Sequence, residues 1–419
     1  MIQTSKRTAV STTATATRSS CSSVAWMIGL TGACNVVLWQ ILYSFQHNAE
    51  YSKSIRSLIP SNQSGPDEHY NSYDPFWQPL DCRQVLKDFE GSDRDLNYGI
   101  LHGRRTITTA PFWVSLHNRS VDFVRWDVME YGLYYERGLT RIFEQTLQES
   151  SASARVLDVG GNIGWFTLLS ASMGHHVDVF EPLEINRARL CQSIVLNQPQ
   201  WQQQQQQTPL PILTTTEDEI RQRTRSNKHP SIHIRPYGIS NAPGTLEIGY
   251  RGGNPGSARI LSGKPPSERS FSSGITQINM TTLDDMAHDL GWLDQSHSNN
   301  NPSHTEIAIL KIDIEGNEPR AILGARQLLQ SGIVKHLLLE VSAASGNDED
   351  ILRMLESIAH AGYKLHQWGG YRGPTQALPS DFPTTTTDPA SQAQYIVQQW
   401  VPKGTQKQVN LWYIHQEAA

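Results

Sequence analysis

The sequence predicts a doubly wound α/β fold, in which a mostly parallel sheet carries helices on both faces. Two observations predict it. Short apolar segments alternate with segments of helical spacing from residue 155 onward, and a glycine-rich turn leads from the first apolar segment into the first helical one. Strand, helix and strand in series connect parallel strands through crossovers that cover both faces of a sheet. The 419 residues are long enough for one substantial core with peripheral segments.

The expected elements follow in chain order. Strands are expected in the parallel part of the sheet at 155–159, 176–180, 231–237, 307–312 and 336–341. Helices are expected around them, because apolar residues recur at helical spacing in 165–173, 185–196, 319–329 and 349–361. Two final strands, 363–367 and 408–415, could close the sheet as an antiparallel edge pair. A partly helical subdomain, 82–150, precedes the sheet and contains a helix at 137–147.

Three low-complexity insertions interrupt the alternation, near 202–230, 295–305 and 379–392. Each falls between expected elements. Long insertions at loop tips cost a packed sheet little, because the entropy of loop closure grows slowly with length. We therefore expect disordered surface segments within a domain that spans 151–419.

The N-terminus predicts a membrane anchor. Residues 24–45 form an apolar run about as long as a bilayer core requires. Lys6, Arg7 and Arg18 precede the run and no acidic residue occurs before Glu50, so the N-terminus is expected to be cytosolic. This gives a cytosolic tail (1–23), a signal anchor (24–45) and a luminal stem (46–81), as in a single-pass type II protein of the Golgi or secretory pathway. A cleaved signal peptide or an organelle transit peptide is the alternative.

Net charge and cysteine content limit the classes of partner and ligand that we expect. The net charge of −5 gives no basic footprint, so we expect no nucleic-acid partner. The four cysteines show no metal-binding spacing, and Cys82 and Cys191 could pair only if the fold brings them together. Three sequons, at Asn62, Asn118 and Asn279, would make the protein a glycoprotein in a secretory lumen. The sequence does not indicate an oligomeric state.

A polar turn at the end of the first strand predicts a nucleoside site. Residues 158–164 read DVGGNIG, in which glycines let the backbone approach a ligand at the start of a helix. Glu181 ends the second strand, where nucleotide-binding sheets place an acid for the ribose hydroxyls. Asn162 and Trp165 stand where a dinucleotide motif needs its second and third glycines, which argues against NAD.

At these residues the chain resembles the FkbM-type family of S-adenosylmethionine (SAM) dependent methyltransferases. The matching segments are LDVGGNIGWFTL at 157–168, VFEP at 179–182, TLD at 282–284, LKIDIEG at 310–316 with the following NE, LGA at 323–325 and LE at 339–340. The resemblance implies a seven-stranded class I methyltransferase fold of Rossmann-like type and SAM as cofactor. It also implies a hydroxyl oxygen as the usual methyl acceptor, on sugars or polyketide-type natural products.

The implied cofactor assigns roles to the turn. Asp158 is expected to meet the ammonium of the SAM amino-acid tail, and Glu181 to hold the ribose. Gly160, Gly161, Asn162 and Gly164 are expected to shape the binding turn. The adenine is expected near 238–241, just after the third strand.

Three carboxylates are the catalytic candidates. A hydroxyl acceptor must lose a proton, and Asp313, at the end of the fourth strand, is our preferred general base, with Glu315 and Glu340 beside it. Asp313 could instead hold the SAM ammonium or order a loop. The three could also surround a divalent ion, but nothing in the sequence fixes their geometry, and we expect no metal site.

The leading hypothesis is therefore a membrane-anchored SAM-dependent O-methyltransferase that acts on a glycan or small natural product. An NAD-type oxidoreductase on a similar sheet is one alternative. A membrane-anchored binding module without catalytic activity is another.

Overall fold

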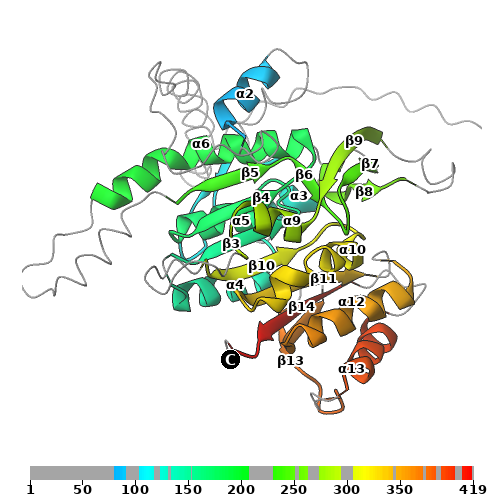
Figure 1. Ribbon diagram of the computed structural model, residues 1–419. Helices are drawn as coiled ribbons and strands as arrows, with labels where there is room; N and C mark the ends of the chain where they lie inside the picture. The colour runs from blue at the N-terminus through cyan, green and yellow to red at the C-terminus, as the bar shows by residue number, and fades with distance from the viewer. Residues whose placement is uncertain are drawn as a thin grey trace, which may run out of the picture. The chain divides into compact units, whose positions relative to one another are not determined.

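The computed structural model describes the part of the chain that contains the sheet (Figure 1). The described residues are 80–90, 103–117, 123–130, 134–151, 153–206, 230–250, 254–262, 273–293, 305–342, 346–370, 374–383, 388–401 and 408–417. The predicted signal anchor, its flanking tail and all but the end of the stem lie outside these residues, as do Asn62 and Asn118. Among the described residues, no helix has the length and apolar character to cross a membrane.

The main sheet is α/β, as the sequence predicts, and it has eight strands in the order β13-β12-β14-β11-β10-β3-β4-β5. Its bounds are β3 (Arg155–Val159), β4 (His176–Phe180), β5 (Ile232–Arg235), β10 (Ile307–Ile312), β11 (Val334–Ser342), β12 (Tyr363–Gly370), β13 (Gln376–Ala377) and β14 (Gln408–His415). The five strands from β5 to β11 are parallel. Strand β14 runs antiparallel between β11 and β12, so it is an interior strand, and the short β13 adds an eighth strand at the edge beyond the seven expected.

The predicted strand 231–237 divides at Pro236, which has no backbone N–H to continue a ladder. Strand β5 ends before it, and β6 (Tyr237–Ile239) enters a second sheet of order β6-β9-β7-β8. The other members are β7 (Gly244–Tyr250), β8 (Arg259–Ile260) and β9 (Ser273–Thr281), with a short 3₁₀ helix η4 (Pro255–Ser257) before β8. The sequon residue Asn279 lies exposed on β9.

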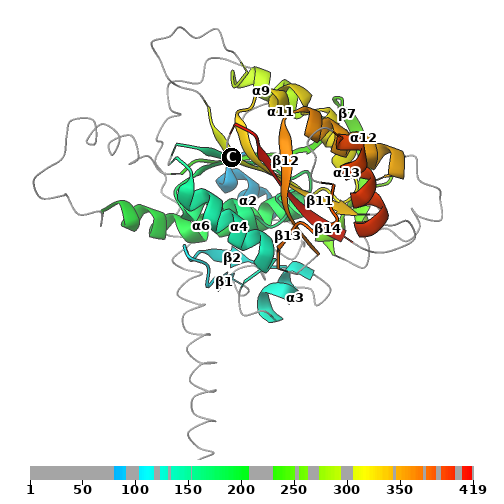
Figure 2. The ribbon, with the colours of Figure 1, turned by 90° about the horizontal axis from the view of Figure 1, so that it is seen from below.

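Helices cover both faces of the main sheet because neighbouring side chains of each strand point to opposite faces. Val156 packs into one core, with α4 (Arg137–Glu149) and α5 (Trp165–Ser172). Leu157 packs into the other, with α9 (Leu283–Asp289), α10 (Glu318–Leu323), α11 (Arg326–Gln330) and α12 (Asp348–His360). Figure 2 shows α4 and α12 on opposite sides of the strands. The predicted helix 319–329 is two helices, because the chain turns at Gly324, whose Cα lies against the backbone of Ser240.

Two insertions are more ordered than the sequence predicts. Helix α6 (Glu184–Gln206) continues ten residues past its expected end and buries Trp201. The expectation of a disordered surface at 379–392 is wrong for the described residues there, because Phe382 is buried and stacks on Trp400. Helix α13 (Pro389–Tyr395) and the π-helical turn η5 (Ile396–Trp400) complete this aromatic cluster. Residues 207–229, 294–304 and 384–387 lie outside the described residues.

The segment before residue 150 shares the core of the sheet. It comprises α2 (Cys82–Glu90), the hairpin of β1 (Gly103–Arg105) and β2 (Trp113–Ser115), α3 (Phe123–Glu130) and α4. Phe143 on α4 packs on Phe166 on α5, so the expected boundary at 150 does not separate two cores. A disulfide between Cys82 and Cys191 joins α2 to α6 across 109 residues of sequence.

A buried charge cluster connects β3, β4 and β5. Asp178 is fully buried and accepts hydrogen bonds of 2.6 Å from both Arg155 Nη1 and Arg235 Nη2. His233 Nδ1 lies 3.3 Å from the same carboxylate. Burial alone would raise the pKa of Asp178, but the hydrogen bond from His233 and the two arginine charges hold it well below its usual range. The carboxylate is therefore ionised and balances cations on both neighbouring strands.

We expect Asp178→Asn to lower the free energy of unfolding by about 3–5 kcal/mol, because it leaves Arg235 buried without its counter-charge. Urea unfolding measures this, with Asp285→Asn as the control, since Asp285 is exposed on α9. The pKa of Asp178 is lowered by folding, so its contribution is complete above the unfolded-state pKa of about 4 and is lost as the pH falls below it. Equal unfolding midpoints for wild type and Asp178→Asn at neutral pH would contradict this role.

Candidate cofactor and catalytic site

The glycine turn lies at the point where the strand order reverses. The chain proceeds from β3 to β4 and β5 in one direction, and β10 and β11 lie on the other side of β3. Loops that leave neighbouring strands in opposite directions open a crevice at the carboxyl ends of these strands, where ligands bind in doubly wound sheets. The expected crevice is therefore at the edge of the sheet formed by the turn after β3 and by Asp313, which follows β10. The Asp313 N–H donates to the Val159 carbonyl at 3.1 Å and holds the two ends together.

Position 160 requires glycine for two reasons: its backbone conformation and the lack of room for a Cβ atom. Its φ of +83° is in the left-handed region, and a Cβ atom there would lie 1.8 Å from the Asp313 carbonyl oxygen. The N–H groups of Gly160 and Gly161 both donate to the Phe180 carbonyl at 3.0 Å. The turn is therefore fixed between the ends of β10 and β4. Gly164, with φ +93°, precedes the first residue of α5.

Glu181 orders this turn from the end of β4. Its Oε2 accepts from the Asn162 N–H at 2.7 Å, and its Oε1 accepts from the Leu183 N–H at 2.9 Å and from Asn186 Nδ2 at 3.3 Å. Burial raises the pKa of Glu181, and these donors oppose the rise. Its position matches the expected ribose-binding acid, but its contacts also give it a structural role that the sequence did not reveal. Binding to ribose stays a prediction.

Asp158, near the end of β3, lies close to Lys311, a residue that the sequence analysis did not identify. Its Oδ2 accepts from Thr167 Oγ1 at 2.6 Å, and its Oδ1 lies 3.7 Å from Lys311 Nζ. Lys311 Nζ also lies 3.2 Å from Asp313 Oδ2. Burial alone would lower the pKa of Lys311, but the charges of Asp313 and Asp158 outweigh it and raise the pKa. The sequence feature that could have identified Lys311 is its position as a charged residue within the apolar strand IAILKI.

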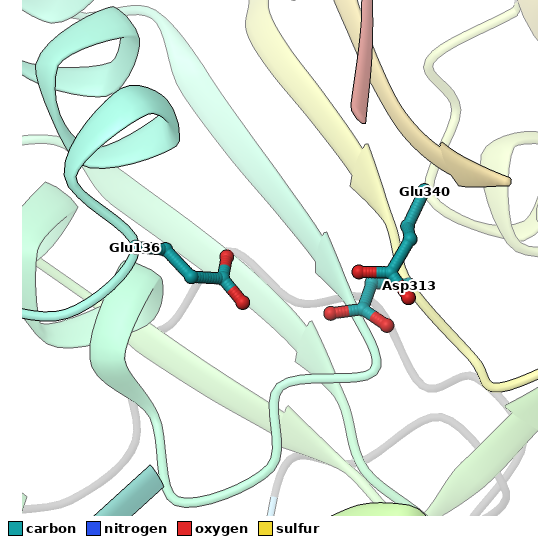
Figure 3. Close-up of side chains that lie close together, drawn as sticks. All are labelled: Glu136, Asp313 and Glu340. Carbon is teal, nitrogen blue, oxygen red and sulfur yellow. The ribbon is translucent and has the colours of Figure 1, made fainter. Parts of the chain in front are cut away.

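Three carboxyl groups, those of Glu136, Asp313 and Glu340, lie close together (Figure 3). Glu136, Asp313 and Glu340 each contribute one oxygen to a group whose atoms all lie within 4.8 Å of one another. Burial and the Asp313 charge raise the pKa of Glu136 to about 7, and the same two causes raise the pKa of Glu340 well above its usual range. The structure thus brings two of the predicted catalytic residues together and adds Glu136, which no motif in the sequence indicated.

Glu315 lies apart from these three carboxylates. Its backbone has φ +54°, and its Oε2 accepts from Arg259 Nη2 at 3.4 Å. Burial and the nearby Asp313 charge raise its pKa to about 7. The left-handed turn sends its side chain toward β8, so it is the least favoured of the three predicted catalytic residues.

Several residues of the matching motifs have structural roles. Thr282 Oγ1 accepts from the Asp285 N–H and caps α9, and Asp284 accepts from the N–H groups of Gln327 and Leu328 at the start of α11. Glu318 Oε1 accepts from the N–H groups of two residues in the loop after β10. These contacts fix the loops on both sides of the crevice without contributing reactive groups.

A cavity of about 310 Å³ adjoins the carboxylates. Its lining includes Glu136, so this side chain faces both the cavity and the carboxylate group. The other lining residues are Asp127, Tyr134, Arg137, Gly138, Arg141 and Pro374. The cavity therefore lies beside the start of α4 and has charged side chains among its lining residues.

A doubly wound sheet with a glycine turn and a strand-end acid at its switch point defines a nucleoside-binding α/β protein. Residues 158–365 match the Methyltransferase FkbM domain, and this part of the chain belongs to that family. The protein is therefore a SAM-dependent methyltransferase, with SAM as its cofactor. The match favours methyl transfer over NAD-dependent oxidation.

Two solved structures are similar to this chain at low scores. One is magnesium protoporphyrin IX methyltransferase (ChlM) from Synechocystis PCC 6803 with bound SAM, at 9% identity and TM-score 0.28, covering 80% of this chain and 98% of that one. The other is a putative SAM-dependent methyltransferase from Streptococcus mutans, at 10% identity and TM-score 0.30, covering 75% of this chain and 55% of that one. No curated protein matches the chain.

The residues at the turn fit SAM. Asn162 Oδ1 and Asp158 Oδ1 are buried and have no hydrogen-bond partner among the described residues, although Lys311 Nζ lies 3.7 Å from Asp158 Oδ1. Such acceptors suit a cofactor that carries an ammonium and hydroxyl donors. The glycines allow the turn to pack closely against its neighbours, because a Cβ at Gly160, Gly161 or Gly164 would overlap atoms of Asp313, Val179 or Leu190. Residues 238–241, the expected adenine site, begin in β6 and continue past its end, and the Ile239 carbonyl accepts from Asn317 Nδ2 at 2.7 Å. The adenine assignment stays a prediction.

We expect Gly160→Ala to weaken SAM binding by about tenfold or more, which corresponds to ~1.4 kcal/mol. The added Cβ must push the turn away from Asp313. Gly174→Ala is the matched control, because Gly174 has a similar φ of +95° but nothing within 4 Å of a built Cβ. Calorimetric titration with SAM measures both. Equal losses of affinity in the two variants would show that backbone strain, not the close approach to Asp313, causes the effect.

Proposed function

We propose that this protein transfers the methyl group of SAM to a hydroxyl oxygen of a glycan or a small natural product. The observation that supports it best is the group of Glu136, Asp313 and Glu340 beside the crevice. An acceptor hydroxyl must lose its proton as the oxygen attacks, and a carboxylate at this edge of the sheet can accept it. SAM supplies an electrophilic methyl group on a sulfonium.

The chain's own residues have three tasks in this proposal. The turn at 158–164 and Glu181 bind and orient the cofactor. Asp313, 24% exposed, accepts the proton from the acceptor hydroxyl, and Lys311 holds the Asp313 carboxylate in place through Oδ2. The cavity beside α4 positions the acceptor, since in-line transfer depends on alignment of oxygen, methyl carbon and sulfur. Its arginine and acidic lining suits an acceptor with several hydroxyl groups.

We further propose that the catalytic part acts in the lumen of the secretory pathway, attached to the membrane by residues 24–45. The Cys82–Cys191 disulfide supports this location, because such bonds persist in oxidising compartments and are rare in the cytosol. The exposed Asn279 would then be available for glycosylation.

The acceptor can be found by comparing cells that contain or lack the protein. Mass spectrometry of their glycans and small molecules should reveal a methyl group that is absent without it. The candidate is then incubated with purified full-length protein and SAM that carries a deuterated methyl group. Transfer of the label to oxygen supports the proposal. SAM binding without transfer to any candidate would support the binding-module alternative, and transfer to nitrogen or carbon would overturn the O-methylation assignment.

We expect Asp313→Asn to lower kcat by about 100-fold, because the amide cannot accept the proton. The Kd for SAM should change by less than about threefold if proton removal is the main role of Asp313. Glu315→Gln, which changes a carboxylate outside the group of three, should retain most of the activity. A large loss of SAM affinity with unchanged kcat would instead assign Asp313 to the SAM ammonium.

We expect two of the four cysteines to react with maleimide when the protein from its native source is denatured without reductant. All four should react after reduction, because Cys82 and Cys191 are then freed. Mass spectrometry of the labelled peptides identifies the reactive positions. Four reactive thiols without reductant would place the protein in a reducing compartment and contradict the luminal location.

A further inference from the structure

The group of Glu136, Asp313 and Glu340 brings three carboxyl groups within reach of one another. The nearby Lys311 Nζ lies within 4.0 Å of Asp313 and of Asp158. Lys311 supplies one positive charge. Ionisation of all four carboxylates would therefore leave a large net negative charge in a buried place, where an unbalanced charge is costly.

Glu136 provides an independent sign of a missing ligand. The residue is 6% exposed, and its Oε2 has no hydrogen-bond partner among the described residues. Figure 3 shows its side chain extending toward Asp313 and Glu340. Buried carboxylate oxygens are normally hydrogen-bonded or bound to a cation. The Glu136 side chain therefore extends toward two other carboxyl groups and has one oxygen without a hydrogen-bond partner among the described residues, although the side chain also forms a hydrogen bond with Tyr135.

The geometry suits one hard cation. Such ions take carboxylate oxygens at about 2.0–2.6 Å, so two ligands on opposite sides of an ion are about 4–5 Å apart. The three oxygens here lie within 4.8 Å of one another, close enough to share one ion. Glu340 is already oriented, because its Oε1 accepts from Gln408 Nε2 at 3.0 Å. Glu136 also lines the cavity beside α4.

We propose that Glu136, Asp313 and Glu340 bind one divalent cation of the oxygen-preferring class, such as Mg²⁺ or Mn²⁺. Three protein ligands leave the remaining coordination positions of the ion for water or an acceptor oxygen. The sequence-based expectation of no metal site considered Asp313, Glu315 and Glu340, whose geometry the sequence did not fix, and it did not include Glu136. The proposed site does not depend on the identity of the methyl acceptor.

Binding of Mn²⁺ to the full-length protein tests the site without SAM or acceptor. The protein is stripped with EDTA and titrated with Mn²⁺, and the electron paramagnetic resonance signal of free Mn²⁺ counts the bound ions. We expect one site in the wild type and at least tenfold weaker binding in Glu136→Gln and in Glu340→Gln. Mg²⁺ or Ca²⁺ should compete for it.

The control is Glu349→Gln, whose side chain is 71% exposed on α12 and should bind Mn²⁺ as the wild type does. Thermal melting checks that each variant folds. Glu136→Gln removes one of the clustered charges, so without metal it should melt no lower than the wild type, whereas the increase in Tm caused by Mn²⁺ should disappear. Absence of binding at ~1 mM Mn²⁺, or unchanged binding in both ligand variants, overturns the proposal. Methyl transfer is measured separately, so failure of the metal site and failure of the proposed activity can be told apart.

Discussion

The close approach between the turn after β3 and the end of β10 is the constraint on which the site depends. The backbone of Gly160 lies so close to the backbone of Asp313 that a Cβ on Gly160 would be 1.8 Å from the Asp313 carbonyl oxygen. This contact is possible because β3 and β10 are parallel neighbours in the sheet. It sets the distance between the cofactor turn and the carboxylate that follows β10, so a single glycine links cofactor binding to the position of the catalytic candidate.

Much of the fold could be predicted from the sequence because the strands of the main sheet are short apolar runs separated by helical spacing. The division at Pro236 follows from the chemistry of proline, but its consequence, a second sheet, depends on pairing with β9, more than forty residues on. The position of β14 between β11 and β12 also depends on pairing between strands that are far apart in the sequence. The aromatic cluster of Phe382 and Trp400 was hidden within a segment of low-complexity composition.

The site was predictable where its residues belong to one local motif. The glycine turn, Glu181 and Asp313 each follow a strand, and strand ends at a common edge of the sheet are brought together by topology. Glu136 carries no such signal, because it precedes α4 and reaches the crevice from the helix layer. Glu315 was predicted to lie beside Asp313 because it is only two residues away in the sequence. The left-handed turn instead directs its side chain to Arg259.

The electrostatics of the crevice also explain why its acidic residues and its cofactor are compatible. SAM carries a sulfonium, and the proposed site beside Asp158 and Asp313 would place its positive charge near carboxylates that share one lysine, Lys311. The proposed divalent cation would bind the neighbouring Glu136 and Glu340. The two cations would share one set of carboxylates, with Asp313 between them. Occupancy of one site must therefore influence affinity at the other, since each charge changes the potential that the other experiences.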